Sequence, residues 1–294
     1  MERVDMQSMK MPIRMVSARK NKEVWKKASY VGLLTLFLLL FLIPVVLIVI
    51  NSFKDEAEFY ARGVLSLPLK PSFDIFREVW QLVEFDVKLY NSLLISTSVA
   101  FLGLLISVMN AYAIGIGKIK WSKLFLAFFA FAMVIPHEAL AYPLYYMMKL
   151  VGLYDTKLAV ILILSVLQSA YGTYLLSSVF RTFPTSLVEA AKIDGCNKWQ
   201  ILMIVVALNK PALSLLLVFY FIWTFNEFFL PLIFLVSNAN QTIPIAVTLF
   251  QGQYTGYATM QSACSLLGIL PCIVFFILFQ RTLTRGLVTG GLKG

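Results

Sequence analysis

Long runs of apolar residues, almost free of charge, restrict the fold of this chain more than any other feature of its sequence. Six such runs lie at residues 29–51, 89–115, 123–149, 158–180, 203–236 and 258–281. Each is long enough to cross the ~30 Å hydrocarbon core of a bilayer as a helix, which satisfies its own backbone hydrogen bonds there. The sequence therefore predicts an all-α, polytopic membrane protein with six transmembrane helices.

The composition leaves little material for any other kind of domain. Of the 294 residues, 60% are hydrophobic and 14% are charged, and no long polar block remains that could build a catalytic domain. We predict a basic N-terminal segment, 1–28, followed by a single transmembrane domain, 29–294. Because the first apolar run carries no small-residue cleavage pattern, we interpret it as a transmembrane helix rather than a signal peptide.

The basic residues predict how the chain is oriented. Of the 25 lysines and arginines, 18 lie in four segments, residues 1–28, 116–123, 181–210 and 281–294. Lysine and arginine are enriched in cytoplasmic segments, so both termini are predicted to be cytoplasmic and the loop 52–88 external. The net charge of +10 is therefore an orientation signal, and no nucleic-acid partner is predicted.

A second segment on the predicted external side, residues 237–257, contains no charged side chain. A long solvated loop without charge is unusual. We therefore predict that this segment folds back toward the helix bundle.

The polar interruption at residues 181–210, on the predicted cytoplasmic side, has the clearest local signals. Pro184 is predicted to end the preceding helix. Ser186, with Glu189 three residues later, fits a capping box, so a short helix is predicted to start at Ser186. Taken alone, Glu189 could do no more than cap this helix.

The short helix is predicted to be open to close approach and to end in a sharp turn. Gly195 tolerates a positive φ, so the chain can turn after Asp194 into a second helix that carries Trp199. Two adjacent alanines would let another surface approach the backbone closely. The face predicted by helical spacing consists of Leu187, Ala190, Ala191 and Asp194.

The pattern Glu189-Ala190-Ala191-x-x-Asp194-Gly195, upstream of Pro211, resembles the cytoplasmic loop of ATP-binding-cassette (ABC) import permeases. The resemblance implies that this loop is a coupling helix that docks into a groove on an ATPase subunit. It also implies that Glu189 faces a basic residue of the ATPase and that Gly195 sets the bend between the two helices of the loop. The coupling residues are then Ser186, Glu189, Ala190, Ala191, Asp194, Gly195 and Trp199.

Further motifs resemble the second permease subunit of maltose-type carbohydrate importers. They are Asn226-Glu227-Phe228, Pro231-Leu232, Thr242-Ile243-Pro244, Phe250-x-Gly252-x-Tyr254 and the tail from Phe279-Gln280-Arg281 to Gly291-Leu292-Lys293-Gly294. The resemblance implies a non-catalytic subunit in the cytoplasmic (inner) membrane of a prokaryote, which imports a di- or oligosaccharide. A polyol, a glycerol phosphate or an acidic saccharide is the alternative substrate.

The same resemblance implies a set of partners. They are a sister permease, two ABC ATPase subunits and an extracytoplasmic solute-binding protein, besides the sugar and the lipid bilayer. ATP and Mg would be bound by the ATPase subunits, and no cofactor is expected on this chain.

Two ionisable residues, His137 and Glu138, directly follow Pro136 inside an apolar run. Such residues are costly in a membrane and usually face a polar cavity or a partner. They could line the translocation pathway, where sugar hydroxyls need hydrogen-bonding groups, or they could pair with neighbouring groups for purely structural reasons.

A second candidate stretch for the pathway surrounds Glu227. The nearby aromatic residues could stack on sugar rings, or they could pack against other helices and lipid. The candidate pathway residues are His137, Glu138, Tyr220, Trp223, Asn226 and Glu227.

Other classes of protein have less support in the sequence. An ion-coupled secondary carrier would use Glu138 and Glu227 as coupling acids, but only three ionisable side chains are embedded in apolar runs. A membrane enzyme is disfavoured because no nucleophile and base pair stands out. The chain has a single histidine and no glycine-rich phosphate-binding loop, so no metal site and no ATP site are predicted on it.

Overall fold

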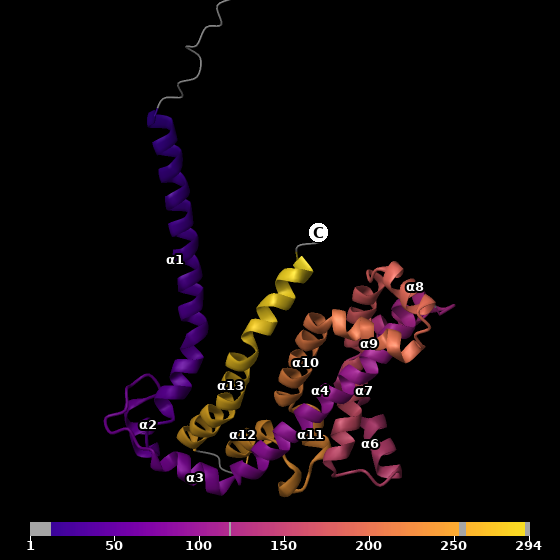
Figure 1. Ribbon diagram of the computed structural model, residues 1–294. Helices are drawn as coiled ribbons and strands as arrows, with labels where there is room; N and C mark the ends of the chain where they lie inside the picture. The colour runs from indigo at the N-terminus through magenta and orange to yellow at the C-terminus, as the bar shows by residue number, and fades with distance from the viewer. Residues whose placement is uncertain (1–12, 118, 253–256, 292–294) are drawn as a thin grey trace, which may run out of the picture.

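The computed structural model describes residues 13–117, 119–252 and 257–291, which form helices and contain no strand. This confirms the all-α prediction for that part of the chain. The basic residues of segment 1–12, Lys118 and the tail residues 292–294 lie outside it. The elements in Figure 1 are α1 (Ile13–Asn51), α2 (Glu56–Arg62), α3 (Asp74–Leu82), α4 (Phe85–Gly115), α5 (Ser122–Ala132), η1 (His137–Leu140), α6 (Ala141–Leu150), α7 (Lys157–Arg181), α8 (Thr185–Ile193), α9 (Lys198–Leu208), α10 (Lys210–Phe225), α11 (Phe229–Phe234), η2 (Asn238–Asn240), α12 (Ile243–Gly252) and α13 (Ala258–Gly291).

Four helices in the described ranges are long and apolar enough to cross a membrane unaided. They are Lys26–Asn51 of α1, α4, α7 and Ala258–Gln280 of α13. Two further spans arise only if bent helix pairs count as one span each, namely α5 with η1 and α6, bent by 94°, and α9 with α10, bent by 80°. The chain is therefore a multi-pass helical protein, and six spans stays a prediction.

The apolar run 203–236, predicted as one span, is divided among three helices, α9, α10 and α11. α9 ends at Leu208 with Asn209 as its cap, and Pro211 stands in the first turn of α10. Proline has no backbone N–H to donate to the preceding turn, so α9 cannot continue through it. As a result α9 lies beside α8 at one end of the bundle, while α10 runs into the bundle (Figure 1).

The packed centre is built by α4, α7 and α10, which approach one another closely at small residues. Ser107 of α4 and Tyr220 of α10 have their hydroxyl oxygens 2.8 Å apart, and the Tyr220 hydroxyl donates to the backbone oxygen of Gln168 on α7, also at 2.8 Å. Gly172 of α7 leaves the space that the Tyr220 hydroxyl occupies. Small residues and interhelical hydrogen bonds of this kind hold helices together within membranes.

The two ends of the described chain lie at the same end of the molecule as α8 (Figure 1). The N-terminal part of α1 and the C-terminal part of α13 point to this end, whereas α2, α3, α6 and α11 lie toward the opposite end. This arrangement agrees with the predicted placement of both termini and the 181–210 loop on one side of a membrane. Which side is cytoplasmic stays a prediction from the charge distribution.

Residues 52–88, predicted as an external loop, form a folded cap that includes α2, α3 and the first residues of α4. Lys54 is fully buried, and its ammonium donates to Asn51 Oδ1 at 2.8 Å and to the backbone oxygens of Gly63 and Val64 at 3.0 and 3.3 Å. Burial lowers the pKa of Lys54. Glu56 Oε1 accepts from the backbone N–H and hydroxyl of Thr259, which ties the cap to the start of α13.

The segment after α11 folds back onto the bundle, which confirms the prediction for residues 237–252. Asn91 of α4 donates through Nδ2 to the backbone oxygens of Ala239 and Gln241, both at 2.9 Å. Residues 253–256 of the predicted segment lie outside the described residues. Buried side chains of α12 then pack against α4 and α13, among them Ile243, Ile245, Ala246 and Phe250.

Asp155, in the turn before α7, holds the start of this segment. Its carboxylate accepts the backbone N–H groups of Val236 and Ser237 at 2.9 and 3.0 Å and the Ser237 hydroxyl. Asn240 Nδ2 donates to the backbone oxygen of Asp155 at 2.7 Å. Partial burial acts to raise the pKa of Asp155, but the hydrogen bonds from Ser237, Asn240 and Val236 outweigh it and hold the pKa below 3.8.

Asp155→Ala is therefore expected to free the 235–241 segment. A carboxyl whose pKa is lower in the folded state stabilises that state above its unfolded pKa, and this contribution is lost as the pH falls through the lowered value. We expect hydrogen-exchange protection of the Val236 and Ser237 amides to fall at least about tenfold in the variant at pH 7. In the unaltered protein the same loss should occur only below pH 3.8. The control is Asp86→Ala, which alters an exposed aspartate at the start of α4. Unchanged protection of the two amides in Asp155→Ala would show that the Asp155 carboxylate does not hold this segment.

Candidate coupling and translocation sites

The 181–210 loop forms two short helices, α8 and α9, as predicted, but the predicted capping box at Ser186 and Glu189 is wrong. α8 begins at Thr185 after Pro184, and no side chain caps it. The fixed φ of Pro184 directs the chain into the helix one residue early, so Ser186 already lies inside the first turn. The loop's capping box is at α9, where Asn197 Oδ1 accepts from the Gln200 N–H at 2.9 Å and Gln200 Oε1 accepts from the Asn197 N–H at 2.8 Å.

Gly195 makes the turn between the two helices, as predicted. Its φ is +80°, and its N–H donates to the Lys192 oxygen at 3.1 Å while the Cys196 N–H donates to the Ala191 oxygen at 2.9 Å. These two bonds define a Schellman motif, in which the residue with positive φ closes the helix. A side chain at Gly195 would meet no heavy atom within 4 Å, so backbone conformation rather than space requires glycine here. Trp199 lies in the first turn of α9 and is 59% exposed.

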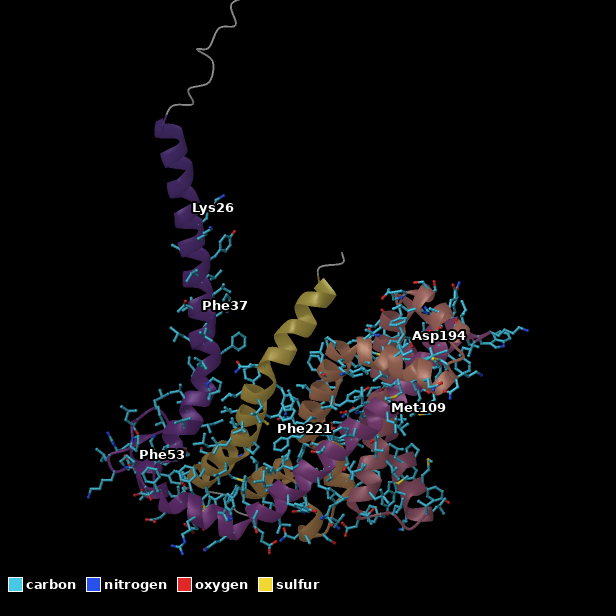
Figure 2. All side chains as sticks on the ribbon, viewed as in Figure 1. Lys26, Phe37, Phe53, Met109, Asp194 and Phe221 are labelled. Carbon is cyan, nitrogen blue, oxygen red and sulfur yellow. The ribbon has the colours of Figure 1, made fainter. Side chains whose placement is uncertain are left out.

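The outer face of α8 is unusually apolar for a polar loop. Ile193 is 87% exposed and Leu187 is 44% exposed, and Ala190 and Asp194 are exposed beside them. Ala191 is buried, so it does not share a free surface with the other three as we predicted. Sequence reasoning missed Ile193, although an apolar residue in the last turn before the glycine was a usable signal. In Figure 2 the labelled Asp194 marks this outer part of the loop.

The inner side of α8 borders a cavity of about 460 Å³. Thr185, Val188, Glu189 and Lys192 contribute from α8, at the i, i+3, i+4 and i+7 spacing of one helix face. The ends of α4 and α7 and the start of α9 form the other walls. Glu189 thus borders this cavity while remaining exposed to solvent.

Toward the end of the molecule away from α8, the break between α5 and α6 lies beside α11, the short helix that follows α10. His137 and Glu138 lie in η1, at the 94° break between α5 and α6, and η1 packs against α11. His137 is half-buried and Glu138 is exposed. The structure therefore places His137 and Glu138 in the same region as Asn226 and Glu227, which lie just before α11 along the chain.

Glu227 has a defined structural role. Its Oε1 accepts the backbone N–H groups of Phe229 and Leu230 at 3.1 and 3.3 Å, so the carboxylate caps the start of α11. A negative charge at a helix N-terminus is favourable. Asn226 is exposed, and its Nδ2 donates to the Ile222 oxygen at 2.8 Å.

The two aromatic candidates of α10 lie in different environments. Tyr220 is fully buried with its hydroxyl occupied by Ser107 and Gln168, so it offers no surface to a solute in this conformation. Trp223 is 42% exposed, stacks on Phe219 and meets the edge of Tyr171. Of the two, Trp223 is the side chain that a solute could contact.

The long apolar helices define a helical, multi-pass membrane protein. Residues 103–287 match the family described as binding-protein-dependent transport system inner membrane component, and the chain belongs to this family. The ABC permease resemblance predicted from the coupling loop is thereby confirmed.

Relatives and a solved structure agree with this assignment. The chain is 31% identical to the sulfoquinovosyl glycerol transport system permease of Agrobacterium fabrum, over 86% of this chain and 89% of the relative. It is 30% identical to the glucose import system permease of Saccharolobus solfataricus, over 94% and 99% of the two chains. A chain of a bacterial ABC transporter involved in importing the acidic polysaccharide alginate has the same fold, with a TM-score of 0.73 and 23% identity over 89% of this chain and 97% of that one.

Proposed function

We propose that this chain is the permease subunit of an ABC importer that moves a carbohydrate of the di- or oligosaccharide class into the cytoplasm. The observation that carries the proposal is the α8 to α9 loop. It presents exposed Ile193 and Leu187 at one end of the bundle, on a short helix fixed by the Gly195 turn. Exposed apolar side chains on a rigid helix are suited to docking in a groove of a partner protein.

The partners in this proposal are a sister permease, two ATPase subunits and an extracytoplasmic solute-binding protein. α1 supports a larger membrane assembly, because its apolar part, Lys26–Asn51, is almost entirely unburied within this chain. Figure 2 shows the labelled Phe37 on a stretch of α1 that stands away from the other helices. A sister permease and lipid in the cytoplasmic membrane of a prokaryote would cover this helix.

In this proposal, α8 transmits the ATP-driven movement of the ATPase subunits to the helix bundle. Closure of the ATPase subunits, which bind ATP and Mg, would displace α8, and the Schellman turn and the α9 capping box would carry that displacement into α9 and α10. The bundle would thereby switch between inward-facing and outward-facing states. This chain performs no catalytic step in the proposal.

Carbohydrate is the substrate class that the relatives favour, since those named above transport a sulfosugar glycoside or glucose. Exposed Trp223 and Asn226, at the end of α10 where α11 follows, offer an aromatic face and an amide of the kinds that bind sugars. A polyol, a glycerol phosphate or an acidic saccharide remains the alternative substrate. These solutes and the sugars all carry hydroxyl groups, for which His137 and Glu138, beside α11, would supply hydrogen-bonding groups.

Reconstitution of the chain in liposomes tests the proposal against an ion-coupled carrier. We expect no sugar uptake from the chain alone under a proton or sodium gradient. Addition of the sister permease, the ATPase subunits and the sugar-loaded binding protein should produce uptake that depends on ATP. Uptake by the chain alone, driven by the gradient and reduced by Glu138→Gln, would establish the carrier instead.

A further inference from the structure

The cavity on the inner side of α8 is unusually basic. Arg181 at the end of α7, Lys192 of α8 and Lys198 of α9 all border its space of about 460 Å³, together with one acid, Glu189. No ion pair or hydrogen bond engages these four side chains within the described part of the chain. The cavity therefore carries an uncompensated positive charge.

The remaining walls of the cavity are mostly apolar. They include Phe180 of α7, Phe183 just after α7, Ile116 just after α4 and Val188 of α8. A cavity with a largely apolar wall and three basic side chains at its border suits an amphiphilic anion rather than a simple salt ion. Phosphate is the anion that arginine and lysine recognise best, because its oxygens accept several charge-assisted hydrogen bonds at once.

The position of the cavity brings it to the membrane surface. α4 ends at Gly115 and α7 ends at Arg181, and both ends are on the predicted cytoplasmic side. Trp121, which follows α4 and precedes α5, is 62% exposed, as is typical of aromatic residues at the level of lipid headgroups. Basic pockets between helices at this level recognise anionic headgroups.

Among the predicted coupling residues, Glu189 alone borders this cavity, so the cavity is largely separate from the surface that would contact an ATPase. The exposed apolar side chains Leu187 and Ile193 are not among those that line it. A docked ATPase could therefore hold the outer face of α8 while a second ligand occupies the inner side.

We propose that this cavity binds a phosphate-bearing anion, either the headgroup of an anionic phospholipid or a soluble phosphate ester. The ligand bridges Arg181 of α7, Lys192 of α8 and Lys198 of α9. Its presence pins the coupling helix to the end of the bundle, and its absence leaves α8 tethered mainly by its two turns. Occupancy thus sets how rigidly α8 can transmit a displacement.

Ligand binding by the full-length chain tests this site without any need for transport. We would place the purified protein in phosphatidylcholine nanodiscs and measure uptake of phosphatidylglycerol by native mass spectrometry. The test variant is R181Q/K192Q/K198Q. The matched control is K27Q/K120Q/K123Q, which removes three exposed basic residues from the same predicted side of the membrane but outside the cavity.

We expect the test variant to bind phosphatidylglycerol about 100-fold more weakly, while the control binds like the unaltered protein. Displacement of phosphatidylglycerol by glycerol 3-phosphate would identify the soluble ester as a ligand of the same site, and resistance to displacement would identify the lipid. Equal binding by both triple variants, each with unchanged helicity by circular dichroism, would overturn the proposal. Because no ATPase or sugar is present, that result would leave the proposed transport function untouched.

Discussion

A Gly195→Pro variant is expected to reach the membrane and yet lose sugar uptake by more than about tenfold in the assembled transporter. Gly195 has a φ of +80°, whereas proline is restricted to a φ near −65°, so the turn cannot form. The variant also removes the N–H that donates to the Lys192 oxygen. α8 would then leave the orientation in which Ile193 and Leu187 face outward, and ATPase movement would no longer reach α9.

Gly152→Pro is the matched control for this prediction. Gly152 has a φ of +72°, donates to the Lys149 oxygen at 3.2 Å and also has no heavy atom within 4 Å of a would-be side chain. It lies in the turn before α7, at the end of the molecule away from α8. We would measure ATP hydrolysis stimulated by the sugar-loaded binding protein, together with uptake. Normal uptake by Gly195→Pro, or equal loss in both variants, would contradict a coupling role for the α8 turn.

Local chemistry explains why the coupling loop could be predicted well from sequence. Gly195 turns because of its own φ preference, and the second helix carries Trp199 because nothing interrupts it after Asn197. The error at Ser186 was also local, since α8 already begins at Thr185 after Pro184 and Ser186 lies inside its first turn. The Asn197 and Gln200 pair was equally readable in the sequence, and it is the one that the structure uses.

The broken spans were harder to predict because hydrophobicity averages over about 20 residues and passes across single breaks. Pro211 after Asn209 and Pro136 before His137 were visible signals, yet a proline within a membrane helix is often tolerated. Only the bends of 94° and 80° in the structure show that the chain is redirected at these two breaks rather than merely kinked.

The role of Tyr220 could not be predicted from the sequence. Tyr220 is buried because Gly103 of α4 leaves room for its ring and Gly172 of α7 leaves room for its hydroxyl. That hydroxyl is hydrogen-bonded to Ser107 and to the Gln168 backbone oxygen, from the same two helices. Nothing in the neighbourhood of Tyr220 along the chain indicates this arrangement. An aromatic residue in an apolar run therefore looks the same whether it faces a solute, lipid or the core.

The packing of Tyr220 against α4 and α7 leads to the second prediction, that Gly172→Leu prevents the protein from accumulating in the membrane. Even a Cβ at Gly172 would lie 2.0 Å from the Tyr220 hydroxyl oxygen and 2.5 Å from Ser107 Oγ, and a leucine must place three further carbons there. Overpacking a filled core costs about 1–3 kcal/mol for modest insertions, and here it also breaks the hydrogen bonds of Tyr220. Gly32→Leu, on α1 where nothing lies within 4 Å, is the control and should accumulate normally.

A smaller substitution with a compensating change tests the cause directly. Gly172→Ala should reduce accumulation and thermal stability in detergent, because its methyl group competes with the Tyr220 hydroxyl for one space. Tyr220→Phe removes that oxygen, so the double variant should recover part of the loss and show a coupling energy of about 0.5–3 kcal/mol. Additive losses in the double variant would show that Leu216, whose Cδ2 would lie 2.7 Å from the added Cβ, or Ser107 dominates the clash instead.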